Sequence, residues 1–112
     1  MKYSVIVTTA TSSHTLETEI MFNLASERVN GTELIRFDIK KVEDEKSNKK
    51  NIQSAMRLFR KLKFERKIQF YANDVSFSNN STEAAFLYNK YPELFVNREV
   101  SNFEKEVIYV KL

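Results

Sequence analysis

The side chains most able to do chemistry in this 112-residue chain are basic, and they are concentrated in one segment. Residues 46–67 hold nine of the eighteen Lys and Arg residues but only one of the fifteen Asp and Glu residues. This segment therefore carries a net charge of +8, and the rest of the chain carries −5. Such a separation attracts polyanions over a Debye length of about 8–10 Å, so the sequence predicts an anionic partner.

The spacing within this segment predicts how the charges are presented. Apolar side chains recur over residues 49–63 at the i, i+3, i+4, i+7 and i+10 positions that form one face of a helix. Lys50, Arg57 and Lys61 fall on the opposite face. We expect a helix that packs on one side and presents a cationic surface on the other.

We interpret this surface as a nucleic-acid-binding site whose cations contact phosphates. The chain has no glycine-rich RNA-binding signature, no zinc-finger spacing and no helix-turn-helix with a glycine turn, and of the two nucleic acids we favour RNA over sequence-specific DNA. Tyr71, on the more polar face of the next predicted strand, is the candidate for stacking on bases, although a half-buried strand tyrosine is the commoner situation. The predicted nucleic-acid-binding residues are Lys49, Lys50, Arg57, Arg60, Lys61, Lys63, Arg66, Lys67 and Tyr71.

Two other interpretations of the basic segment stay open. A run of charges is often only a solvated helix face with no ligand. The segment also suits a protein-interaction module, which would bind an acidic protein partner or a second copy of the chain to form a homo-oligomer. A membrane-surface role is disfavoured, because a small domain needs the apolar stripe of this helix for its own core.

No group of residues predicts catalysis or a cofactor. His14 lies among Ser12, Ser13 and Thr15, but a nucleophile and its base assemble in space with an orienting acid rather than as sequence neighbours. The adjacent carboxylates of residues 43–45 lack the spacing of a calcium loop, and a chain with one Gly cannot form a glycine-rich phosphate loop. We predict a non-enzymatic regulatory or accessory protein with no catalytic residues, metal site, cofactor or small-molecule substrate.

The composition favours a cytoplasmic protein. There is no Cys, and therefore no disulfide and no thiolate ligand, which fits a reducing compartment. The longest N-terminal apolar run is residues 5–7, far shorter than the apolar region of a signal peptide. Nothing approaches the ~20 apolar residues that a membrane span requires.

Most of the remaining chain divides into short elements. Residues 2–9 form a predicted strand, which consecutive apolar residues place in the centre of a sheet. Residues 67–77 predict another strand and residues 81–91 a second helix, which Pro92 ends or kinks. A final strand is expected to include residues 107–112, where apolar side chains alternate between two faces.

Residues 16–43 fit two different structures. In the favoured one they form a β-hairpin, with Asn30-Gly31 as its two-residue turn. The hairpin register pairs Arg28 with Glu33, Ser26 with Ile35, Leu24 with Phe37 and Phe22 with Ile39. In the alternative, residues 16–29 are a helix with Leu16, Ile20 and Leu24 on one stripe, and Gly31 stops it before a strand.

Together these elements predict one α+β domain spanning residues 1–112. The sheet is expected to be largely antiparallel or mixed, with about five strands and two helices packed on it. If residues 16–29 are instead a helix, the first strands form a βαβ-type mixed sheet.

Overall fold

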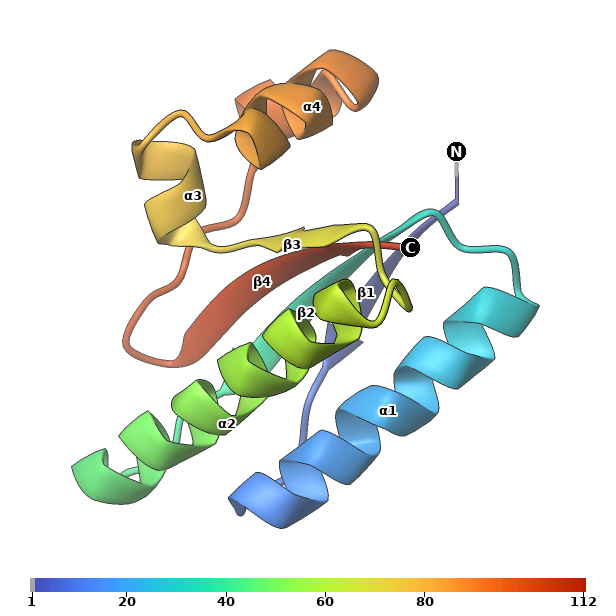
Figure 1. The fold of residues 1–112 in the computed structure, drawn as a ribbon. Coiled ribbons are helices and arrows are strands. Elements are labelled where there is room, and N and C mark those ends of the chain that lie inside the picture. The colour runs from blue at the N-terminus through green and yellow to red at the C-terminus, as the bar shows by residue number, and fades with distance from the viewer. Residues whose placement is uncertain (1) are drawn as a thin grey trace.

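One mixed four-stranded sheet organises the chain, and the computed structural model describes residues 2–112 (Figure 1). The strands are β1 (Tyr3–Val7), β2 (Leu34–Lys40), β3 (Phe70–Ala72) and β4 (Lys105–Lys111), and their spatial order is β1-β2-β4-β3. β1 and β2 run parallel, whereas β4 is antiparallel to both of its neighbours. The last strand in the chain therefore lies inside the sheet.

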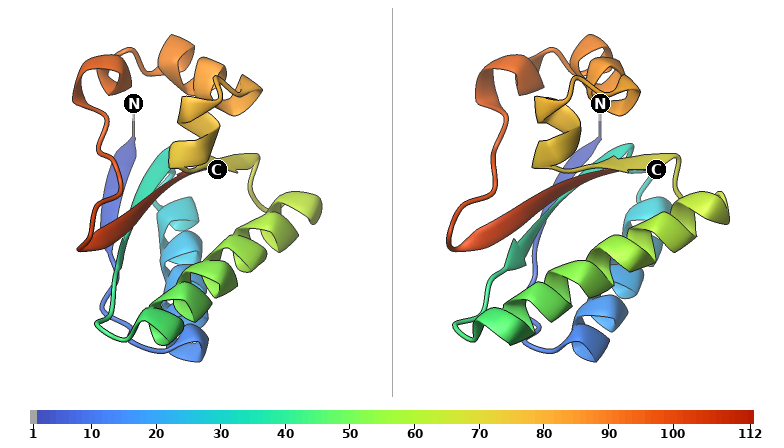
Figure 2. Two further views of the ribbon diagram at one scale, coloured as in Figure 1. Left: turned by 90° about the vertical axis from the view of Figure 1, so that its left-hand side faces the viewer. Right: turned by 60° about the vertical axis from the view of Figure 1, so that its left-hand side comes forward.

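Helices cover both faces of the sheet, and the two views of Figure 2 show the resulting layers. α1 (Ser13–Val29) and α2 (Glu45–Phe64) lie on one face. α3 (Asp74–Ser78), α4 (Thr82–Lys90) and α5 (Glu93–Asn97) lie on the other. The predicted α+β class and mixed sheet are confirmed, although the sheet has four strands rather than about five, and the described residues form five helices rather than two.

Two hydrophobic cores result, because successive strand residues point to opposite faces. Under α1 and α2, Ile35, Phe37 and Ile39 of β2 meet Ile108 and Val110 of β4. On the other face, five strand residues pack against α3, α4 and α5: Leu34, Phe70, Ala72, Val107 and Tyr109. β2 and β4 contribute to both cores and are the most deeply buried strands.

The favoured hairpin over residues 16–43 is wrong, and the alternative of a helix followed by a strand is correct. Asn30-Gly31 ends α1 instead of turning a hairpin. The Gly31 N–H donates to the Arg28 carbonyl and the Thr32 N–H donates to the Glu27 carbonyl, which is the Schellman pattern of a helix C-terminus. Gly31 takes a φ of 72°, the left-handed conformation that this motif requires.

β1 was predicted to be a central strand, and this is also wrong. It forms one edge of the sheet and pairs only with β2. The predicted strand over residues 67–77 is reduced to the three residues of β3, because Asn73 caps α3 immediately afterwards with its side chain on the Ser76 N–H. The predicted helices over 49–63 and 81–91 are present as α2 and α4, the latter ending before Pro92.

Replacing Gly31 tests the assignment of a helix stop. Gly31→Ala should lower the free energy of unfolding by about 1 kcal/mol, since an L-residue resists a left-handed φ while no atom lies within 4 Å of the added Cβ. Chemical denaturation measures the change. Gly31→Asn is the matched control and should lose less, because Asn tolerates this conformation. Equal stability of all three proteins would contradict the assignment.

A candidate nucleic-acid interface on helix α2

Packing against the sheet fixes which face of α2 meets solvent. Ala55, Phe59 and Leu62 are buried in the core beneath the helix. The Phe59 ring lies 5.5 Å from the ring of Phe37 on β2 and 6.0 Å from that of Tyr71 on β3. These aromatic contacts hold α2 against two strands, so its other side cannot turn inward.

The outward side of α2 is a continuous basic surface, which we call the cationic stripe. Its exposed residues are Lys46, Lys49, Lys50, Gln53, Arg57, Arg60, Lys61 and Phe64. At 1.5 Å per residue, the stripe is about 27 Å long. No carboxylate interrupts the sequence between Glu45 at the start of the helix and Glu65 at its end.

Carboxylates neutralise few of the basic groups in residues 46–67. Lys63 Nζ lies 3.3 Å from Glu83 of α4, and Lys67 Nζ lies 3.5 Å from Glu65. The pKa of Glu83 is lowered, first by its own backbone amide and further by Lys63. Within residues 2–112, none of the other seven basic side chains has a carboxylate oxygen within 4.0 Å.

Of the three carboxylates of the neighbouring helix α1, one reaches α2 and the other two bond to residues in or next to β1. Glu17 accepts a hydrogen bond from the Ser54 hydroxyl at 2.7 Å. Glu19 accepts from the Thr9 amide at 3.0 Å, and Glu27 accepts from the Ser4 hydroxyl at 2.8 Å. Apart from Glu17, the α1 residues that line the space beside the stripe include exposed Thr18, Met21 and Phe22, which carry no charge.

A hollow of about 580 Å³ lies between α1 and α2, next to the stripe. Its lining includes Lys61, Glu65 and Lys67 from the basic segment and Glu17, Met21 and Phe22 from α1, so its charges are mixed. Phe22 is 71% exposed, and Phe64 at the end of the stripe is 87% exposed. The surface thus combines unpaired cations with aromatic rings in water, which is the combination used to bind single-stranded nucleic acids.

The predicted site residues divide into three groups in the structure. Lys49, Lys50, Arg57, Arg60 and Lys61 come together on the stripe. Lys63, Arg66 and Lys67 lie at its C-terminal end, with Lys63 turned toward α4. The stacking candidate, Tyr71, is half-buried against Phe59 in the core beneath α2 and is not part of the exposed surface.

Phe22 and Phe64 are exposed aromatic residues that were not among the predicted site residues. The signal for Phe64 was present, because it follows Lys46 by eighteen residues, or five turns of helix, and so lies on the same line of the helix surface. The position of Phe22 could not be found this way, since the favoured hairpin placed it opposite Ile39 in a core.

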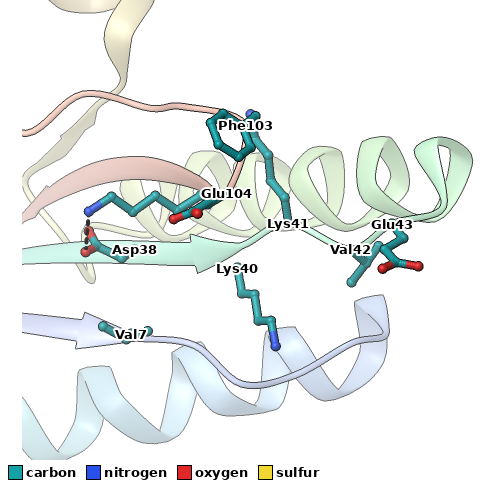
Figure 3. Close-up of a pocket in the computed structure, with 9 residues that line it drawn as sticks. Val7, Asp38, Lys40, Lys41, Val42, Glu43, Phe103 and Glu104 are labelled. Carbon is teal, nitrogen blue, oxygen red and sulfur yellow. Dashed lines mark hydrogen bonds and ion pairs between the residues drawn. The ribbon is translucent and has the colours of Figure 1, made fainter.

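Another hollow of about 580 Å³ lies at the end of β2, and its charges are also mixed (Figure 3). Lys40 and Lys41 point to opposite sides of the strand end. Lys105 Nζ lies 3.3 Å from the buried carboxylate of Asp38. With three lysines and three carboxylates in its lining, this hollow does not concentrate one kind of charge.

Comparisons with known proteins do not assign a function. The chain matched no protein-family model, no curated protein and no solved structure. In the part of the chain that the structure describes, no three His, Asp or Glu residues are placed to hold a metal ion. No helix among residues 2–112 is long and apolar enough to cross a membrane.

Arg66 occupies a backbone position that ordinarily favours glycine. It follows α2 with a φ of 60°, and the Lys67 N–H donates to the Leu62 carbonyl in the same Schellman pattern that ends α1. α1 has Gly31 at the equivalent position, and α3 has Asn80, whose φ is 49°. The basic segment thus has an arginine at a position where the left-handed backbone conformation lowers the stability of the fold.

Arg66→Gly should raise the free energy of unfolding, by up to about 1 kcal/mol, because it relieves the left-handed strain. Thermal and denaturant unfolding measure this. Arg60→Gly, the same replacement inside α2, should instead lower stability by about 1 kcal/mol. A loss of stability in both variants would show that Arg66 is not strained.

Proposed function

We propose that this protein is a non-enzymatic regulatory or accessory protein that binds RNA through the cationic stripe of α2. The observation that carries the proposal is the row of unpaired basic side chains along one helix face, held outward by the burial of the opposite face. Lys and Arg residues that contact phosphates release counterions, which supplies most of the affinity for a nucleic acid.

The exposed aromatic rings favour a single-stranded RNA over a duplex. Unpaired bases stack on aromatic side chains, whereas bases inside a duplex do not expose their faces. Phe64 lies on the stripe, and Phe22 lines the hollow beside it. A strand whose phosphates follow the stripe would bring its bases within reach of both rings. We place this activity in the cytoplasm, in keeping with a chain that has no Cys.

A protein-interaction role is the second candidate, and a specific observation favours it. The face of β1 away from α1 exposes Tyr3, Val5 and Val7. This surface lies apart from the cationic stripe, because α1 separates the two. An acidic protein bound to the stripe itself would compete directly with RNA.

Charge reversal on the stripe tests the main proposal. Affinity for a single-stranded RNA should fall by ~10³ or more between 50 and 200 mM salt if about six phosphates are contacted. Combined Lys50→Glu, Arg57→Glu and Lys61→Glu replacements should abolish binding while leaving the fold intact, because all three side chains are exposed. Fluorescence anisotropy with a labelled oligonucleotide measures both effects.

The matched control reverses three exposed lysines outside the stripe, at Lys2, Lys40 and Lys90. It changes the net charge by the same amount, so it should reduce affinity only modestly. Comparable losses in both triple variants would indicate a general charge effect rather than a site. Absence of RNA binding by the unmodified protein at low salt would refute the proposal.

Removal of the aromatic rings tests the stacking contribution separately. Phe64→Ala and Phe22→Ala should each weaken binding of single-stranded RNA by about 1–3 kcal/mol if a base stacks on the ring. The dependence of affinity on salt should not change, since no phosphate contact is lost. Phe103→Ala, at an exposed ring away from the stripe, is the control. Unaltered affinity in the first two variants would remove the aromatic rings from the interface.

A further inference from the structure

β1 has the sequence of a buried strand but occupies an edge of the sheet. Its five residues include no charged side chain, no Pro and no Gly. Natural edge strands are usually shortened, charged or covered, because an open edge invites pairing with another strand. The opposite edge follows this rule, since β3 has only three residues and α3 begins two residues later. β1 lacks any such protection.

The outer edge of β1 offers a regular set of free backbone groups. The Lys2 carbonyl accepts from the Leu34 amide of β2, and the Thr8 N–H donates to the Asp38 carbonyl. Both groups therefore point toward β2, and the alternation of a strand turns the N–H and C=O of the intervening odd-numbered residues outward. Those residues are Tyr3, Val5 and Val7.

The same three residues also expose their side chains. They lie on the face away from α1, and α3, α4 and α5 cover β3 and β4 instead of this part of the sheet. Val5 is 42% exposed and Val7 is 65% exposed. Backbone donors, backbone acceptors and apolar side chains are thus available on one short strand.

This pattern is self-complementary in one antiparallel register. With Val5 opposite the Val5 of a second copy, Tyr3 of each chain lies opposite Val7 of the other. All three residues then form hydrogen-bonded pairs that join Val, Val and Tyr side chains on the open face, while Ser4 lies opposite Ile6 on the face of α1. The two-fold axis passes between the Val5 residues, so one surface patch meets itself as a symmetric dimer requires.

The charge distribution is compatible with the same arrangement. α1 lies along β1, as its Glu19 contact to Thr9 and its Glu27 contact to Ser4 show. α2 packs beyond α1, toward β3. In a symmetric pair, both copies of α1 therefore separate the two +8 segments, which weakens their mutual repulsion.

We propose that this protein forms a two-fold symmetric homodimer in which β1 pairs antiparallel with β1 of a second copy. The result is one eight-stranded sheet, a common size for a continuous sheet, in which β1 is a central strand. The two-fold axis is perpendicular to the sheet, so both cationic stripes lie on the same face of the eight-stranded sheet. The dimer does not depend on RNA binding, and its test requires no nucleic acid.

The experiment uses the complete chain and a cysteine at the expected axis. Because the chain has no Cys, Val5→Cys introduces the only thiol. A hydrogen-bonded antiparallel pair has a Cα–Cα separation of about 5.5 Å, within the range that a disulfide accepts. Mild oxidation should convert this variant to a covalent dimer, seen on a non-reducing gel. Val29→Cys, at an exposed residue of α1, is the matched control and should remain largely monomeric.

Sedimentation equilibrium over the micromolar range provides the second measurement. The unmodified protein should show twice the mass of one chain, and Val5→Lys should lose the dimer because it sets two like charges opposite one another. Val29→Lys should not. A monomeric unmodified protein would overturn the proposal. So would a dimer that survives Val5→Lys, or equal cross-linking of the two cysteine variants, since each would place the contact elsewhere.

Discussion

The candidate site depends on one contact, the packing of Phe59 of helix α2 against the sheet. Its ring meets Phe37 of β2 and Tyr71 of β3, two strands that are not neighbours in the sheet. With its apolar stripe held in this way, α2 has only one face left for solvent, and that face carries the basic residues. The hydrophobic core thereby decides the direction of the charges, although no charged group takes part in it.

Helices cover the two faces of the sheet unequally, and this leaves one face of β1 exposed. α1 and α2 are long and lie under all four strands, whereas α3, α4 and α5 are short and pack mainly over β3 and β4, with only Leu34 of β2 in that core. Tyr109 of β4 meets Phe77 of α3 with ring centroids 5.6 Å apart. None of the ring pairs found in the described chain includes a residue of β1, and its Val5 and Val7 remain 42% and 65% exposed.

Three helices end in a residue with a left-handed backbone conformation, and only one of these residues is poorly suited to it. α1, α2 and α3 each end in a Schellman motif with a left-handed residue. Gly31 and Asn80 suit that conformation, and Arg66 does not. The exception falls within the basic segment, where an additional cation extends the surface that we propose for RNA. Stability and charge thus favour different residues at this one position.

The sequence alone determined the elements with a clear period: helix α2, helix α4 and the final strand, as well as the α+β class and the grouping of the basic residues. It could not decide residues 16–29, because Leu16, Ile20 and Leu24 form a narrow stripe while exposed Met21 and Phe22 obscure the helical period. Asn30-Gly31 supports a hairpin turn and a helix stop equally well, since both use a left-handed residue.

Only the tertiary structure decided where each surface lies. It placed Tyr71 against the core beneath α2, and it placed exposed Phe22 beside the stripe by making residues 13–29 a helix. It also placed β1 at an edge, since β4 returns from the end of the chain to pair with β2. The local sequence of β1 contains no information about a pairing between β2 and β4, which are far apart in the chain. An apolar strand predicted to be central therefore lies at the edge of the sheet.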